Sequence, residues 1–292
     1  MRIDLHTHSD ASDGTQSPAD LVALAHQAGL DVVALTDHDS AAGWAEATAA
    51  ARDVGVTLVL GMEISTRHEG AGVHLLAYLP DPADPALGAE LGLILAGRTG
   101  RLEAMVERLR DGGLDISVAE VLHQVGEAPA IGRPHVADVL VTKGYAADRS
   151  DAFTRWLNSG TPGYVSRYAT PTREMVRLIT GAGGAAVMAH PWGRGSRRVV
   201  DLETLALFQA EGLVGIEVDH QDHDAADRQE LTRLAGEIGL VRTGSSDFHG
   251  DGKVDHELGC NLTKPDQLDQ LLEAAASNAA ASGRAVPEVV RP

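Results

Sequence analysis

The chain has 292 residues and a formal net charge of −18, and 43% of its residues are hydrophobic but only 3% are aromatic. This length fits one large domain or a barrel with a smaller insert, with a core of Ala, Val, Leu and Ile. The acidity disfavours binding to duplex nucleic acid, which normally needs a basic surface, although bound metal ions can supply local positive charge for a phosphorylated substrate.

The sequence also has features that bear on location. The apolar runs are too short for a membrane span, and no apolar signal-peptide stretch follows Met1. A single cysteine excludes an internal disulfide framework. We therefore expect a cytoplasmic protein, and the sequence leaves its oligomeric state open.

Predicted strands and helices alternate in the first third of the chain. Apolar periodicity and helix-start signals predict strands at 3–5, 31–35, 57–60 and 73–79, and helices at 17–29 and 41–54. Between 85 and 165 the strand signal disappears, and glycine-separated segments predict three to five short helices. Alternation then resumes, with strands at 185–189, 214–218 and 240–243 and helices at 172–180, 202–209, 225–238 and 265–276.

These repeated strand–helix units predict an α/β fold with a parallel sheet and helices outside it. Six or seven units favour a closed barrel over an open sheet. We expect residues 1–84 and 166–276 to form the barrel, residues 85–165 a helical insert or cap, and residues 277–292 a weakly specified tail.

Side chains that can bind metals follow most of the predicted strands. Functional residues of β/α barrels gather at the carboxyl ends of the strands, so we expect these side chains to converge. His6 and His8 are two positions apart and face the same side of an extended segment, and Asp247 and His249 repeat this spacing. The nine candidate ligands are His6, His8, Asp13, His38, Glu63, His74, His190, Asp247 and His249. His74 is the least regular, because it opens its strand instead of ending it.

Imidazoles mixed with carboxylates suit zinc, manganese or iron better than calcium or magnesium. Nine ligands are more than one ion needs, so we expect two or three divalent ions, with Glu63 shared between two of them. Taken singly, each residue has a plain structural explanation, such as a turn for Asp13 or a partly buried ring for His74. Taken together they do not, because burying so many polar groups without a shared partner would cost on the order of several kcal/mol.

Six segments resemble motifs of the PHP (polymerase and histidinol phosphatase) superfamily. They are residues 6–8, 36–39, 61–65, the strand with His74, 189–191 and 244–250, in this order. The resemblance is closest to the bacterial branch with 3′,5′-nucleoside bisphosphate phosphatases and a 5′→3′ exoribonuclease, whose helical insert has a Gly-Arg-x-His element matched at 132–135. The fold that this resemblance implies is a distorted (β/α)7 barrel.

The resemblance also implies how the ligands divide among three sites. The first ion would be held by His6, His8, Glu63 and Asp247, the second by Glu63, His74 and His190, and the third by Asp13, His38 and His249. The aspartates Asp4, Asp37 and Asp39 could orient ligand imidazoles by hydrogen bonds.

The implied activity is hydrolysis of a small phosphate monoester by metal hydroxide, with a nucleoside 3′,5′-bisphosphate or a 5′-mononucleotide as the expected substrate and partner. His135 and His220 are candidates for protonating the leaving group. Arg133, His135 and Arg194 are candidates for binding phosphate. An ordinary helix start with a solvated arginine explains Arg133 equally well.

Four alternatives stay open: a 5′→3′ exonuclease on short RNA or DNA, a histidinol phosphatase, a C–N hydrolase and a non-catalytic metal-stabilised domain. A processive nuclease would need a basic track with stacking aromatics, which this acidic, aromatic-poor chain lacks. A C–N hydrolase would need a carbamylated lysine at a strand end, and Lys143, Lys253 and Lys264 are not expected there.

Overall fold

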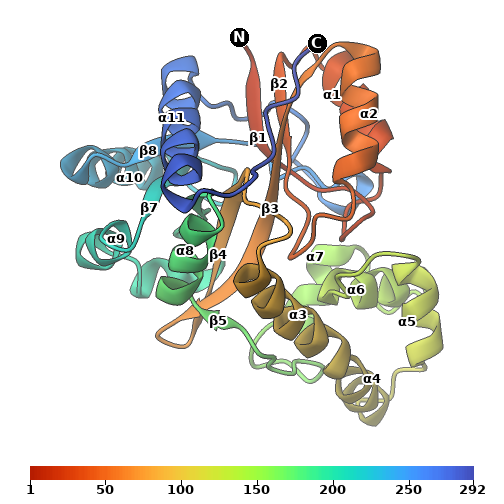
Figure 1. Cartoon of the computed structure of the whole chain (residues 1–292). Helices are drawn as coiled ribbons and strands as arrows, with labels where there is room; N and C mark the ends of the chain where they lie inside the picture. Colours follow the sequence, from red (N-terminus) through yellow and green to blue (C-terminus); the bar gives the residue numbers. More distant parts are fainter.

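The computed structural model describes the backbone of all 292 residues and every side chain except that of Arg194. A curled sheet lies at its centre, with the strand order β1-β2-β3-β4-β6-β7-β8 and the short β5 paired to β3 (Figure 1). The strands are β1 (Ile3–Thr7), β2 (Val32–Leu35), β3 (Thr57–His68), β4 (Ala71–Tyr78), β5 (Thr170–Pro171), β6 (Ala185–Ala189), β7 (Leu213–Asp219) and β8 (Val241–Gly244).

The two ends of the sheet approach each other on the side where the chain leaves β1 and β8. The His8 N–H donates to Phe248 O at 2.8 Å, and Thr7 and Phe248 form a parallel bridge. Every residue of β1, β2 and β6 is buried, as expected for strands that are covered on both faces of the sheet.

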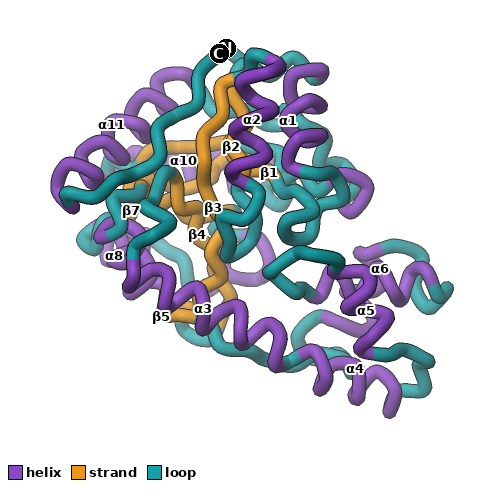
Figure 2. The backbone as a smooth tube through the Cα atoms, turned by 45° about the vertical axis from the view of Figure 1, so that its right-hand side comes forward, coloured by secondary structure: helices purple, strands orange, loops and turns teal.

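Six helices pack around the sheet and five more form the insert (Figures 1 and 2). The first set is α1 (Pro18–Gln27), α2 (Trp44–Val54), α8 (Thr172–Gly181), α9 (Leu202–Gln209), α10 (Ala225–Ile238) and α11 (Pro265–Ser282). The second set is α3 (Pro85–Gly100), α4 (Leu102–Asp111), α5 (Val118–Val125), α6 (Arg133–Thr142) and α7 (Arg149–Ala152), followed by a π-helical turn at Phe153–Leu157. Local capping starts α1, where the Asp20 N–H donates to Ser17 Oγ at 3.0 Å and Pro18 occupies the first turn.

The strand β4 departs from the predicted repeat, because it runs antiparallel to both β3 and β6. It follows β3 through the turn Glu69-Gly70, where both residues have positive φ, 45° and 79°. Such a turn closes a two-residue hairpin, so no helix separates these strands. The α/β fold with a curled sheet is therefore confirmed, whereas the count of seven strand–helix units is not.

The chain has two hydrophobic cores. Leu87 and Ile94 of α3 belong to the core between sheet and outer helices, whereas Leu109, Leu140 and other residues from α4 onward form a second, smaller core. Figure 1 shows α4–α7 as a lobe beside the sheet. The domain limits at 85 and 165 stay a prediction, and α3 is the helix that contributes to the larger core.

The end of the chain is more ordered than the sequence suggested. The last helix runs to Ser282 instead of ending near 276, and Val290 exchanges two backbone hydrogen bonds with Leu58, at 2.9 and 3.0 Å. The limits of the tail at 277–292 stay a prediction, and these two bonds tie its end to β3. Figure 2 shows the two termini close together at the top of the sheet.

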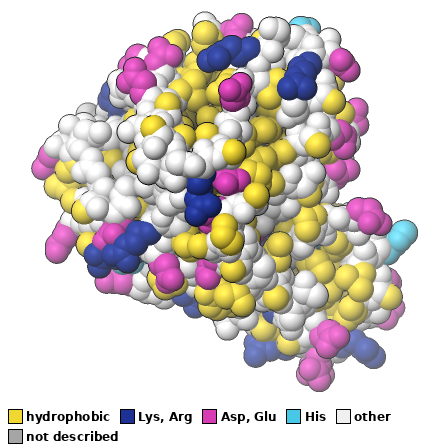
Figure 3. Space-filling model, in the orientation of Figure 1, with side chains coloured by type: hydrophobic (Ala, Val, Ile, Leu, Met, Phe, Trp, Pro, Cys, Tyr) yellow, Lys and Arg dark blue, Asp and Glu magenta, His cyan; other side chains and the backbone are white. Residues whose placement is uncertain are grey.

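The surface agrees with the acidic composition. Figure 3 shows Asp and Glu side chains scattered over one face, with Lys and Arg in smaller groups. In the described part of the chain, no helix is both long enough and apolar enough to cross a membrane.

Candidate metal centre

The nine predicted ligands lie at one end of the sheet. The antiparallel direction of β4 explains why His74 lies in the amino-terminal half of its strand and not at its carboxyl end, because the amino end of β4 lies at the carboxyl end of its neighbours. In the sheet, His74 pairs with Ser65 of β3 and with Ala189, the residue before His190. What the sequence presented as an irregular placement is thus a regular one.

Four buried ligand atoms converge in the first group. His6 Nε2 and His8 Nε2 lie 3.0 Å apart, and Glu63 Oε2 lies 3.4 and 3.3 Å from them. Asp247 Oδ1 completes the group at 3.5 and 3.4 Å from the same two nitrogens. All four side chains are completely buried. Two nitrogen lone pairs and two carboxylate oxygens this close fit a shared cation.

The hydrogen bonds of His6 support this interpretation. Its Nδ1 lies 3.1 Å from Glu217 Oε1, which assigns the proton to Nδ1 and leaves Nε2 as a bare lone pair. Glu63 Oε2 accepts no hydrogen bond from any described residue, although it is buried. A buried carboxylate oxygen without a hydrogen bond is costly unless a cation compensates for it. The residues present therefore fit a divalent metal ion.

The second group shares Glu63 through its other oxygen. Glu63 Oε1 lies 2.6 Å from His74 Nδ1 and 3.0 Å from His190 Nε2. One carboxylate thus faces the first group with Oε2 and the second with Oε1, as a bridging ligand would.

The third group gathers around Asp13. His249 Nε2 lies 3.4 Å from Asp13 Oδ1, and His38 Nε2 lies 3.7 Å from Oδ2. Both imidazoles donate from Nδ1 to backbone carbonyls, His249 to Asp247 O at 2.8 Å and His38 to Glu63 O at 3.3 Å. Each therefore presents a bare Nε2 to the carboxylate of Asp13, and this donor set also fits a cation.

Buried charges balance each other in these groups. Burial alone raises the pKa of Glu63, but the imidazoles of His74, His38 and His6 hold it well below its usual range. Burial likewise lowers the pKa of His8, yet hydrogen bonds to Asp247 and Glu63 raise it to about 9. The buried carboxylates need nearby positive charge to stay ionised. Protonated imidazoles or bound metal ions can supply this charge.

The aspartates next to the predicted ligands accept hydrogen bonds from neighbouring loops and not from the imidazole rings of the ligand histidines. Asp37 accepts from Ser9 N, Ser9 Oγ and Ser12 Oγ at 2.6–2.8 Å, and Asp4 accepts from the N–H groups of Ser246 and Gly259 at 3.0 and 2.8 Å. These hydrogen bonds of Asp37 and Asp4 go to serine and glycine groups and not to imidazole rings, so they do not support the expected role of orienting the ligand histidines.

Asp39 acts in the same way. It accepts from Ser65 N at 2.8 Å and forms an ion pair with Arg98 at 2.6 Å. The carboxylate that orients an imidazole is Glu217, which the sequence analysis missed. A glutamate inside the apolar run of β7 was the available signal.

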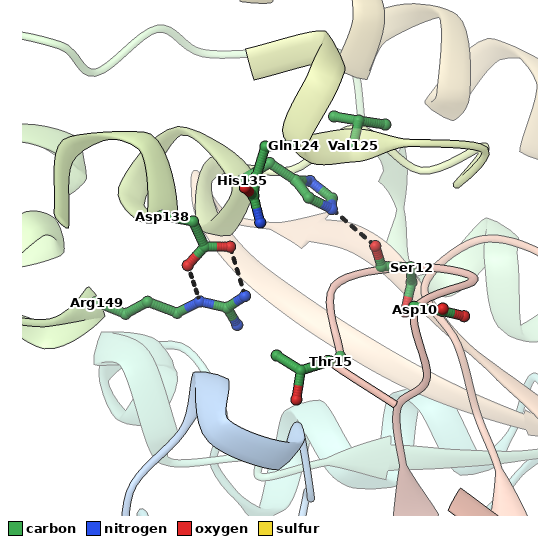
Figure 4. A pocket seen from close by; sticks show the side chains of 9 residues that line it. Asp10, Ser12, Thr15, Gln124, Val125, His135, Asp138 and Arg149 are labelled. Atoms are coloured by element: carbon green, nitrogen blue, oxygen red, sulfur yellow. Dashed lines mark hydrogen bonds and ion pairs between the residues drawn. The ribbon is translucent and has the colours of Figure 1, made fainter. Parts of the chain in front are cut away.

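Two side chains of the insert reach the loop that contains Asp13. His135 Nε2 lies 2.9 Å from Ser12 O, and Arg149 Nη1 donates to Asp13 O at 2.9 Å. Arg149 is itself held by two hydrogen bonds to Asp138, at 2.6 and 2.7 Å. Figure 4 shows the His135–Ser12 and Arg149–Asp138 contacts beside a cavity of about 200 Å³ between the insert and the loop.

His135 has both ring nitrogens engaged, because its Nδ1 also accepts from Gly132 N–H at 3.0 Å. This geometry gives it a structural contact and does not favour its predicted roles as a proton donor and a phosphate ligand.

His220 lies with His6 and Asp247 in a cluster small enough for a metal ion. Its Nδ1, however, accepts from Asp222 N–H at 3.0 Å, so the proton is on Nε2, which lies 3.3 Å from Asp247 Oδ2. A protonated nitrogen cannot bind a metal. We therefore interpret His220 as a hydrogen-bond donor to Asp247, not as a ligand.

The remaining candidates differ in their surroundings. Arg133 donates to Leu157 O at 3.1 Å and lies over the Phe153 ring at 5.2 Å. The side chain of Arg194 lies outside the described residues. Lys253, which was not expected near the site, forms an ion pair with Asp247. This cation holds the pKa of Asp247 well below its usual range against the opposing effect of burial.

The PHP domain model matches residues 4–116. Over 258 residues, 88% of this chain and 90% of the relative, the chain is 37% identical to the 3′,5′-nucleoside bisphosphate phosphatase of Chromobacterium violaceum. The chain belongs to the PHP family. The resemblance predicted from the six motifs is thus confirmed.

Two further PHP-family comparisons cover nearly the whole chain. It is 36% identical to the 5′-3′ exoribonuclease of Haemophilus influenzae, over 91% of this chain and 96% of that protein. The solved structure of a protein from Bifidobacterium adolescentis, provisionally described as a metal-dependent phosphoesterase, is similar with a TM-score of 0.89 and 39% identity. This similarity covers 93% of this chain and 96% of that one.

Proposed function

We propose that this PHP-family protein is a metal-dependent phosphoesterase that hydrolyses phosphate monoesters of nucleotides, such as nucleoside 3′,5′-bisphosphates or 5′-mononucleotides. The observation that supports this most is the convergence of His6, His8, Glu63 and Asp247, in which one oxygen of each carboxylate lies 3.3–3.5 Å from both imidazole Nε2 atoms. The functions named for the relatives support a phosphoesterase independently of this geometry.

In this proposal the three groups hold two or three divalent ions, with manganese, iron or zinc as the preferred metals. Glu63 contributes to the first and second groups, and Asp13 belongs to the third. When bound, such ions lower the pKa of coordinated water and neutralise charge on phosphate oxygens.

The neighbouring side chains keep the ligand atoms in place. Glu217 fixes the ring of His6 so that Nε2 faces the group. His220 and Lys253 both bond Asp247 through Oδ2, so Oδ1 faces His6 and His8. In this proposal residues 85–165 form a cap, and His135 and Arg149 are its contacts to the loop that contains Asp13. The rest of the chain is a distorted (β/α)7 barrel, and the protein is located in the cytoplasm.

A second candidate function is 5′→3′ removal of nucleotides from short RNA. It is favoured by the exoribonuclease of Haemophilus influenzae, which is 36% identical to this chain. The net charge of −18 argues for short substrates, because long polyanions would be repelled.

A phosphate-release screen tests both candidates. Metal-reconstituted protein would be incubated with nucleoside 3′,5′-bisphosphates, mononucleotides, short 5′-phosphorylated oligonucleotides and histidinol phosphate. We expect release from the nucleotides, and products one nucleotide long from the oligonucleotides would favour the exonuclease. No turnover of any substrate with manganese, iron or zinc would contradict the proposal.

A further inference from the structure

One lysine reaches the predicted metal centre. Lys253, in the segment that follows β8, forms an ion pair with Asp247 of the first group. Among the described side chains, no other lysine or arginine forms an ion pair with any of the nine predicted ligands, whose remaining close partners are mainly imidazoles and carboxylates of the same groups. This single ammonium therefore has a different chemistry from everything around it.

Hydrogen bonds on both sides of Lys253 hold its segment in place. Before it, the Asp251 N–H donates to Thr15 Oγ1 at 3.0 Å. After it, Gln221 Nε2 donates to Asp255 O at 2.6 Å. The segment is thus tied to the loop after β1 and to the loop after β7, and its position does not depend on the lysine side chain alone.

The direction of the Lys253 side chain follows from its backbone. Lys253 is extended, with φ −144° and ψ 121°, so neighbouring side chains point to different sides. The next residue, Val254, points into solvent and is 76% exposed, whereas Lys253 turns inward to Asp247. A long cationic side chain is therefore directed into the site from its rim.

The two oxygens of Asp247 have different partners. Oδ2 accepts from His220 Nε2 at 3.3 Å and from the ammonium of Lys253. Oδ1 lies 3.5 and 3.4 Å from the Nε2 atoms of His6 and His8. Two oxygens of one phosphate group are about as far apart as the two oxygens of a carboxylate. A phosphate beside Asp247 can therefore face the first group with one oxygen and Lys253 with another.

The exposure of these side chains shows from which side a substrate arrives. Among the nine predicted ligands, His74 is the most exposed at 17%, followed by His38 at 8%. Lys253 is 24% exposed, whereas His220, the other donor to Asp247 Oδ2, is completely buried. Among the described side chains, the Lys253 ammonium has no acceptor other than Asp247. Since an ammonium has three N–H groups, it can still donate to a substrate.

The charge of the phosphate group decides how much such a donor contributes. At about pH 8 a phosphate monoester has three terminal oxygens that share close to two negative charges. A phosphodiester has two terminal oxygens that share one. The additional charged oxygen of a monoester forms its strongest hydrogen bonds with a cationic donor, and an ammonium next to the metal groups provides one.

We propose that Lys253 binds the phosphate group that is hydrolysed and makes the protein prefer phosphate monoesters to phosphodiesters. This inference rests on the proposed function and favours its first candidate, because an exonuclease cleaves phosphodiesters. The ammonium keeps its bond to Asp247 and donates another N–H to a terminal oxygen of the monoester. It retains its protons throughout, so it stabilises charge on the phosphate and does not protonate the leaving group.

Lys253→Met tests this contact, since it keeps the apolar stem and removes the charge. Lys143→Met is the matched control. Lys143 is 23% exposed, against 24% for Lys253, and it also pairs with carboxylates, those of Asp115 and Glu120 in the insert. If Lys253→Met unfolds, Lys253→Gln replaces it, because the amide still offers Asp247 a hydrogen bond, and the same results are expected.

The turnover measurement uses two substrates with the same leaving group, p-nitrophenyl phosphate and methyl p-nitrophenyl phosphate. The first is a monoester and the second a diester, and kcat/KM of the metal-reconstituted protein is measured for both at about pH 8. We expect the ratio of monoester to diester kcat/KM to fall about ten- to a hundredfold in Lys253→Met and to stay unchanged in Lys143→Met. Damage to the metal centre lowers both values and cancels in the ratio. A ratio within about threefold of the wild type would overturn the proposal.

A binding measurement keeps the contact separate from turnover. Metal-loaded protein is titrated by calorimetry with inorganic phosphate and with dimethyl phosphate. Lys253→Met should bind phosphate about tenfold more weakly than the wild type and the control, with dimethyl phosphate little affected. Metal content by mass spectrometry should be equal in all three proteins. Loss of an ion in Lys253→Met would show that Lys253 only holds Asp247 for the metal, and would overturn the substrate contact.

The two proposals fail in different ways. Equal losses on monoester and diester, or unchanged binding of phosphate, would overturn the role of Lys253 while phosphate release from nucleotides still supports the enzyme. No phosphate release from any nucleotide by the wild type, with phosphate binding weakened in Lys253→Met as expected, would overturn the proposed function and leave Lys253 as part of an anion site.

Discussion

The first and third of the predicted metal groups are supported by different parts of the chain. In the predicted metal groups, buried carboxylates such as Glu63 and Asp247 lie against imidazole nitrogens, a donor set that attracts a cation. In the first group, further bonds to Asp247 come from His220 and Lys253, which follow the strands β7 and β8 of the sheet.

In the third group, support comes from the insert. Arg149 bonds the backbone carbonyl of Asp13, and Asp39, which directly follows His38, bonds Arg98 of α3. This contrast shows two ways of placing a ligand. Loops of the sheet hold the first group, whereas the third also depends on how the insert packs, so substitutions in either part should affect the two groups unequally.

The largest effect is expected from Glu63→Gln, which removes the carboxylate shared by two metal groups while preserving its shape. We expect kcat to fall by at least about a thousandfold, because a charged ligand of two ions is lost. Metal content by mass spectrometry should fall by one ion or more. Glu69→Gln, in the exposed β3–β4 turn, is the control, and unchanged metal content in Glu63→Gln would separate Glu63 from the metal groups.

Asp39→Asn tests the connection between the third group and the insert. Arg98 would stay charged and buried without its partner, which should cost about 3–5 kcal/mol of unfolding free energy. Denaturant titration measures this loss, with Glu230→Gln in an exposed pair with Arg233 as a control that should cost less than about 1 kcal/mol. Equal small losses in both variants would mean that Arg98 is solvated or finds another partner.

His220→Gln distinguishes a donor from a ligand. Since the Nε2 proton faces Asp247, we expect unchanged metal content and a kcat about ten- to a hundredfold lower. His26→Gln, on the exposed side of α1, serves as the control. Loss of a bound ion in His220→Gln would show that its Nε2 is a ligand after all.

The smallest effect is expected from Arg149→Met, which removes the insert's contact to the carbonyl of Asp13 and keeps the carboxylate itself. We expect the affinity of the third group for metal to fall about tenfold, and metal titration followed by calorimetry measures it. Arg155→Met, in an exposed pair with Asp151, is the control. Equal affinities in both variants would mean that the insert does not position the Asp13 loop.

Much of the fold followed from local patterns. The helices α9 and α10 begin and end at the predicted residues 202–209 and 225–238. Each starts at an aspartate cap, and α10 also ends at the left-handed Gly239. The β3–β4 hairpin was missed, since Glu69 adopts a positive φ that its residue type does not announce. The bond between Val290 and Leu58 was also missed, because pairing between distant segments leaves no local signal.

In the site, too, some features could be predicted from local sequence patterns, whereas others depend on contacts between distant residues. The spacing of His6 and His8 at a strand end indicated ligands, and the structure brings the nine candidates together. The roles of His135 and His220 could not be predicted, because they depend on which backbone groups bond each ring nitrogen. The contact of Lys253 with the first group was also missed, because it depends on how the segment after β8 folds.

The most direct test of this account is a crystal structure of the protein saturated with manganese, with anomalous scattering used to locate the ions. We predict anomalous peaks coordinated by His6, His8, Glu63 and Asp247, by Glu63 with His74 and His190, or by both sets. Saturated crystals with no peak within coordination distance of Glu63 would contradict the claim that these side chains form a metal centre.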